Sequence, residues 1–180
     1  MKRPACLLLL LASAFGAAQR PAVTRDALAG MERAFDQRIQ RFDLNDPLDL
    51  LGSTRGVYLQ GYGAVFTAEV NLIAGAVITP FRPKPSPPEL EKLRQRKAAR
   101  LQQLVRQMRE VMLDLAAALT DVPPQEHIAL GVSIFYFSWE NREGLPSQVV
   151  LRARRQALLD AQARRADPAA LEALLPAEVF

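Results

Sequence analysis

Three glycines, Gly56, Gly61 and Gly63, lie within the segment 55–70 among apolar and aromatic residues, and this segment is the first place to look for phosphate chemistry. A P-loop needs G-x-x-x-x-G-K-[ST], because its lysine reaches the outer phosphates and its hydroxyl holds magnesium. Gly56 and Gly61 have the required spacing, but Tyr62 and Gly63 occupy the Lys and Ser/Thr positions. A dinucleotide loop must open a helix, whereas the residues after Gly63 continue as a strand pattern. The glycines therefore predict a tight turn or bulge between two strands.

Nucleophilic or metal chemistry has few residues to use. His127 is the only histidine, which excludes a metal site built on two or more histidines. A serine nucleophile would have to pair with His127, and none of the available serines lies in a G-x-S-x-G elbow. These serines are Ser53, Ser133, Ser138 and Ser147. We interpret His127 as a hydrogen-bonded residue at the edge of a strand.

Carboxylates offer a second route to acid–base chemistry. Glu69 interrupts an apolar strand pattern two residues before Asn71. The favoured interpretation is that Glu69 and Asn71 mark the water-facing side of that strand. The sequence thus predicts no catalytic residue, no metal ligand and no cofactor.

Recognition residues are the remaining candidates. Arg55 directly precedes Gly56, Tyr62 lies at the bend between Gly61 and Gly63, and Trp139 lies beside Glu140 and Arg142 near a second turn. Arginine and aromatic side chains are enriched where proteins bind partners. Arg55, Tyr62 and Trp139 are therefore the predicted partner contacts.

The N-terminal residues 1–18 have the three parts of a secretory signal peptide: a basic start, a short apolar core and small residues at a cleavage site. The apolar core is about half the ~20 residues that span a bilayer, so we expect no transmembrane anchor after cleavage, although retention of the segment as an anchor stays open. The only cysteine, Cys6, precedes this core and is misplaced for lipidation. Loss of Lys2 and Arg3 leaves 21 basic residues against 19 acidic ones, which does not favour nucleic-acid binding. The expected location is secreted or periplasmic.

The elements that position these residues follow from periodicity. Apolar residues at steps of three and four predict helices at 24–42, 87–119 and 151–164. Alternating or continuous apolar runs predict strands at 56–59, 65–72, 127–139 and 147–151, with a further short strand at 74–81. A proline-rich connector spans 79–88, and Asp167-Pro168 begins a short last helix.

The helix 87–119 carries a coiled-coil-like seam of Leu104, Met108, Val111 and Leu115 among others. We favour packing of this seam on the sheet, with a homodimer through the helix as the alternative. The first half of the helix is basic, and its cations are interpreted as a solvated face, the alternative being a surface for an anionic envelope polymer or lipid.

We therefore predict an α+β fold: a two-layer sandwich of a mostly antiparallel sheet packed against a long amphipathic helix and shorter helices. One domain spans 22–165, and a short C-terminal helix and tail span 166–180. The second face of the sheet is expected to be covered by other helices or by a partner.

Two functions remain open. The preferred one is an exported, non-catalytic binding or assembly module of a bacterial-type cell envelope, with a protein or envelope component as its partner. The alternative is a small exported hydrolase that uses carboxylates or a lone Ser/His pair.

Overall fold

A computed structural model describes residues 23–43, 45–74 and 85–180. Its elements, in chain order, are α1 (Arg25–Gln40), β1 (Asp49–Leu50), β2 (Arg55–Leu59), β3 (Gly63–Asn71), α2 (Pro87–Ala118), β4 (His127–Ile134), β5 (Gln148–Arg154), α3 (Arg155–Ala163), α4 (Pro168–Leu174) and β6 (Glu178–Val179). These elements confirm the predicted α+β class. The predicted leader 1–18, most of the predicted strand 74–81 and most of the connector 79–88 lie outside the described residues.

The strands form one sheet in the order β1-β3-β4-β5-β6, with β2 also paired to β3. Every pairing is antiparallel except that of β3 with β4. A parallel pair needs a long crossover, and α2 forms part of the connection between β3 and β4. The prediction of a mostly antiparallel sheet is confirmed, and the central parallel pair makes the sheet mixed.

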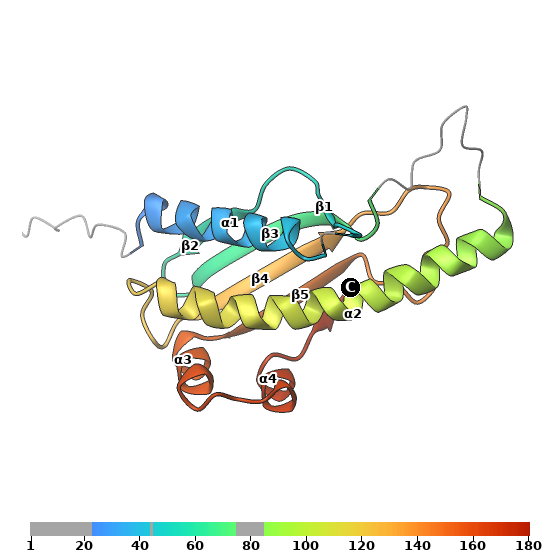
Figure 1. Ribbon diagram of the computed structural model, residues 1–180. Helices are drawn as coiled ribbons and strands as arrows, with labels where there is room; N and C mark the ends of the chain where they lie inside the picture. Colours follow the sequence, from blue (N-terminus) through green and yellow to red (C-terminus); the bar gives the residue numbers. More distant parts are fainter. Residues whose placement is uncertain (1–22, 44, 75–84) are drawn as a thin grey trace, which may run out of the picture.

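Helices α1 and α2 cross the same face of the sheet, with α3 and α4 beside its β5–β6 side (Figure 1). The core under them includes Phe66, Leu130 and Leu151, which are paired across β3, β4 and β5 and are at most 1% exposed. The helix seam meets this core, since Leu104 and Met108 are fully buried. The seam of α2 therefore packs on the sheet, as favoured from the sequence.

Helix α1 is fastened to β2 by a buried carboxylate. Glu32 is 7% exposed and accepts two hydrogen bonds from Arg25, at 2.7 and 2.6 Å, and one from the Gly56 N–H at 2.6 Å. The same Arg25 donates to the Gly56 carbonyl at 3.1 Å. The Arg25 hydrogen bonds hold the pKa of Glu32 below its usual value although burial opposes this.

Helix starts obey the capping signals in the sequence. The Thr24 hydroxyl accepts from the Ala27 N–H at 3.2 Å, and Asp167 accepts from the Ala170 N–H at 2.8 Å. At the start of α2, Glu89 accepts from the Ser86 N–H at 2.7 Å, the reach-back bond of a capping box.

Three element boundaries around β4, β5 and α3 were predicted wrongly from the sequence, and two short strands were missed. β4 ends at Ile134 and not at residue 139, because β5 pairs no further than Gln148 against Ser133. β5 runs on to Arg154, so α3 begins at Arg155 and not at residue 151. The sequence did not predict the short strands β1 and β6, and β6 lies within the predicted C-terminal tail. In each case pairing with a neighbouring strand decides the conformation, which local propensity does not report.

Candidate binding face of the sheet

In the described part of the chain, one face of the sheet has no helix over it, and we call this the open face. Burial alternates along β3: Phe66 is 1% exposed toward the helices, whereas Thr67 and Glu69 are exposed on the other side. The pairing register places the following positions on the open face: 55, 57 and 59 of β2, 65, 67 and 69 of β3, 127, 129, 131 and 133 of β4, 148, 150, 152 and 154 of β5, and 178 of β6.

The middle of the open face combines small and apolar residues with two polar ones. The central strand β4 has Ala129 beside Val65 of β3 and Arg152 of β5, and Gly131 beside Thr67 of β3 and Val150 of β5. At the β2 edge, Val57 and Leu59 are 48% and 47% exposed. A strand that faces water typically carries polar side chains at such positions, so these apolar residues distinguish the open face from an ordinary solvated one.

One end of the open face gathers four side chains with recognition chemistry. The Tyr62 ring stacks on His127 with 5.3 Å between ring centroids and 19° between planes. Arg152 donates to Glu178 at 2.7 Å. The Glu178 carboxylate raises the pKa of Arg152, and the nearby Tyr62 phenol adds a smaller contribution. Tyr62, predicted as a contact residue, is thus placed beside the only histidine of the chain.

The glycines shape this end and do not hold a phosphate. Gly61 and Gly63 have φ values of +82° and +130°, which side-chain-bearing residues rarely adopt. A Cβ at Gly63 would lie 1.8 Å from the His127 carbonyl oxygen. Gly63 therefore permits both the turn and the close approach of β3 to β4, and β3 follows where a phosphate loop would open a helix.

Charged residues occupy the corners of the open face. Glu69 lies on β3 at the end where β4 finishes, and Arg154 lies on β5 opposite His127, where β4 begins. Arg55 lies at the β2 edge. All three are exposed, and none makes an ion pair within 4.0 Å with another described residue.

The serines considered as hydrolase nucleophiles do not lie beside His127. His127 begins β4, whereas Ser133 lies six residues further along the strand, about 20 Å away at the rise of an extended chain. Ser138 follows the end of β4, and Ser147 precedes the β5 residue that pairs with Ser133. Ser53 precedes β2 at its end away from the hairpin turn.

Glu69 and Asn71, the two polar residues considered on β3, differ in their exposure to solvent. Glu69 is exposed, but Asn71 is 4% exposed and its carboxamide oxygen accepts from the Ile73 N–H at 3.3 Å. The interpretation that Asn71 marks the wet side of the strand was therefore wrong: this residue fixes the chain as it leaves β3. Within residues 23–43, 45–74 and 85–180, no three His, Cys, Asp or Glu side chains cluster as metal ligands would.

Trp139 lies apart from the other predicted contacts. It follows the end of β4, while Tyr62 lies beside the start of that strand. Trp139 is half-buried and stacks on Phe137 with 5.4 Å between ring centroids. Phe137 in turn meets Phe135 edge to face at 4.9 Å. Of the three predicted contacts, Arg55 and Tyr62 lie on the open-face side of the β2–β3 hairpin. Trp139 lies beyond the opposite end of the open face, where β4 ends.

A buried ion pair holds the loop that carries Trp139 and was missed in the sequence. The Lys97 ammonium lies 2.6 Å from the Glu140 carboxylate, and the two side chains are 1% and 2% exposed. The ammonium also lies 4.8 Å from the centre of the Tyr136 ring. Burial lowers the pKa of Lys97 and raises that of Tyr136 to about 12.

Lys97 and Arg100 correct the interpretation of the basic part of α2 as solvated throughout. They are 0% and 6% exposed, whereas Lys92, Arg96 and Arg106 are exposed. Arg100 pairs with Asp46 at 2.7 Å. The signal available in the sequence was the position of Lys97 and Arg100, which continue the apolar seam toward the start of the helix at steps of three and four residues.

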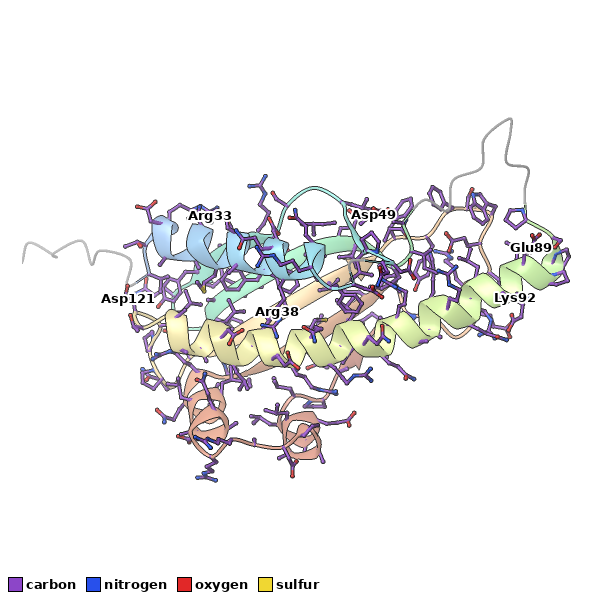
Figure 2. The ribbon with its side chains drawn as sticks, in the orientation of Figure 1. Arg33, Arg38, Asp49, Glu89, Lys92 and Asp121 are labelled. Atoms are coloured by element: carbon purple, nitrogen blue, oxygen red, sulfur yellow. The ribbon has the colours of Figure 1, made fainter. Side chains whose placement is uncertain are left out.

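Two grooves beside α2 lie on the helix side of the described residues. One, of about 530 Å³, lies between α1 and α2 where Arg38 bridges to Glu110 and Asp114 (Figure 2). The other, of about 690 Å³, lies between α2 and α4. Ion pairs cross both, since Arg109 binds Glu172 at 3.2 Å beside the second.

No helix in the described ranges is both long enough and apolar enough to cross a bilayer. Set against protein-family models, curated proteins and solved structures, the chain has no match.

Proposed function

We propose that this protein is an exported, non-catalytic binding module of a bacterial-type cell envelope and that the open face contacts its partner. The observation that carries the proposal is the uneven cover of the sheet. Both α1 and α2 lie over one face, and the other face combines exposed Val57 and Leu59 with charged corners (Figure 1). Contiguous apolar surface rimmed by polar residues is typical of protein–protein interfaces.

The small central residues support this function. Ala129 and Gly131 are buried beneath their neighbours, so no large side chain projects from the middle of β4, and a partner would contact the half-buried Val65 and Val150 on either side. Tyr62 and Arg152 at one end supply the aromatic and guanidinium groups that frequently dominate binding energy. The proposal that the protein is exported rests on residues 1–18, which have the pattern of a signal peptide.

Site-specific photocrosslinking in cells tests the proposal. A photoreactive phenylalanine analogue would replace Thr67 on the open face, or Arg33 on the outer side of α1 as the matched control (Figure 2). We expect position 67 to capture one defined protein, identified by mass spectrometry, and position 33 not to capture it. A further change, Val57→Asp, is expected to reduce that capture at least tenfold without unfolding the domain.

Absence of any adduct at position 67, or equal capture at both positions, contradicts the proposal. The hydrolase alternative predicts a different result: turnover of an ester, peptide or glycan that is lost when Glu69 or His127 is replaced.

A further inference from the structure

The open face is self-complementary in charge. Glu69 and Arg154 occupy diagonally opposite corners, separated by two strand spacings across the sheet and by six residues along it. These distances are about 10 Å and about 20 Å. Between the two corners, β4 contributes Ala129 and Gly131. Val65 and Arg152 flank Ala129, and Thr67 and Val150 flank Gly131.

A two-fold axis lying between two such faces can exchange the two corners. Glu69 of each copy then faces Arg154 of the other, and both contacts form because an isologous interface repeats every contact. Val65 and Val150 in the middle of the two faces come into contact at the same time. Neither residue has an ion pair among the described residues to give up.

We infer that the occupant of the open face is a second copy of this chain, packed sheet against sheet. The inference rests on the proposed function, because it names the partner of the same face. It differs from a dimer through α2, whose seam residues Leu104 and Met108 are already buried against the sheet. The central four strands offer about 500 Å² of face, less than the about 800 Å² per partner of a standard interface, so the dimer is expected to be weak and to need high protein concentration.

Charge reversal on the purified protein tests the inference by sedimentation. Glu69→Arg alone and Arg154→Glu alone each create two like-charge contacts per dimer, and each is expected to weaken dimerisation about tenfold. The control Arg33→Glu reverses an exposed charge on α1 and is expected to leave dimerisation unchanged.

An equimolar mixture of the two charge-reversal variants restores both contacts in the mixed dimer. The arginine introduced at position 69 of one copy faces the glutamate introduced at position 154 of the other. The second contact joins the two residues that were left unchanged, Arg154 of the first copy and Glu69 of the second. The mixture is therefore expected to dimerise within about threefold of the wild type.

Three results overturn the inference: a wild type that stays monomeric at high concentration, single variants that dimerise like the wild type, or a mixture that fails to recover. Circular dichroism checks that each variant is folded. A monomeric wild type whose position 67 still captures a different protein in cells overturns the second-copy occupant and leaves the proposed function standing. A monomer that captures nothing at position 67 overturns both.

Discussion

At the residue scale, the least expected feature is a lysine without contact to water. Lys97 and Glu140 are 1% and 2% exposed and join α2 to the loop after β4. Removing one member of such a pair leaves an unpaired charge in the interior, whereas replacing both by apolar side chains removes the charges together.

We therefore predict that Lys97→Met and Glu140→Met each lower the free energy of unfolding by about 3–5 kcal/mol. For the double variant, we expect the loss in the free energy of unfolding to be much smaller than the sum of the two single losses. Urea denaturation measures all three. The matched control is Arg96→Met, which breaks an ion pair whose arginine is 57% exposed and is expected to cost at most about 1 kcal/mol. Additive losses would show that the pair is not coupled.

Glu32 provides a pH-dependent contribution to stability. Its pKa is lowered in the folded protein, chiefly by the Arg25 hydrogen bonds, so the unfolded chain binds its proton first as the pH falls. The stabilisation is complete above the unfolded value of 4.5 and is lost as the pH drops through the lower folded pKa. Glu32→Gln is expected to be less stable than the wild type at neutral pH, with the difference narrowing below pH 4.5.

Thermal unfolding across this pH range, with Asp121→Asn as a control at an exposed site, checks the expectation (Figure 2). A difference between wild type and Glu32→Gln that stays constant with pH would exclude the proposed linkage.

The two hairpin glycines, Gly61 and Gly63, differ in how well they tolerate substitution by alanine. Gly63→Ala places a methyl group 1.8 Å from the His127 carbonyl oxygen, so we expect the β3–β4 pairing to fail and little folded protein to be recovered. A Cβ at Gly61 would meet no atom within 4 Å, so the only cost of Gly61→Ala is the positive φ of 82°. We expect this variant to lower the free energy of unfolding by about 1–2 kcal/mol. Circular dichroism and recovery of folded protein distinguish the two, and equal behaviour would contradict the steric explanation.

At the element scale, α2 stabilises the fold through one stripe. Leu104→Ala is expected to lower the free energy of unfolding by about 2–5 kcal/mol, because Leu104 is fully buried on the sheet. The exposed neighbour Gln103 serves as control, and Gln103→Ala should change stability by less than about 0.5 kcal/mol. A Leu104→Ala variant of unchanged stability would indicate that this stripe is not packed on the sheet.

Most elements could be predicted because their signals are local. The cap residues Thr24, Ser86 and Asp167 mark helix starts, and the glycines between 56–59 and 65–72 mark the hairpin. The ends of β4 and β5 could not be predicted, because they depend on where Ser133 meets Gln148 and not on the residues themselves. The sequence RARR consists of residues with high helix propensity, yet pairing of β5 with β4 extends the strand through Arg154.

The candidate site was predictable only in part for the same reason. Tyr62 was identified from its place at a turn, but its stacking on His127 requires the parallel register of β3 with β4. Burial of Lys97 depends on Glu140, 43 residues later, and no local pattern pairs them. Membership of the open face likewise depends on the strand order.

At the scale of the whole molecule, the central claim is that a partner covers the open face in the cell. Cysteine labelling measures this cover directly, since Cys6 is the only native cysteine and Cys6→Ala gives a cysteine-free background. Single cysteines at Thr67 on the open face and at Arg33 on α1 then report the two sides of the molecule.

The deciding measurement compares the rate of alkylation of each cysteine in intact cells with its rate in dilute purified protein. We predict that the cysteine at position 67 reacts at least tenfold more slowly in cells, while the cysteine at position 33 reacts at similar rates in both. Equal rates at position 67 in cells and in dilute solution would contradict the claim that the open face is the binding face.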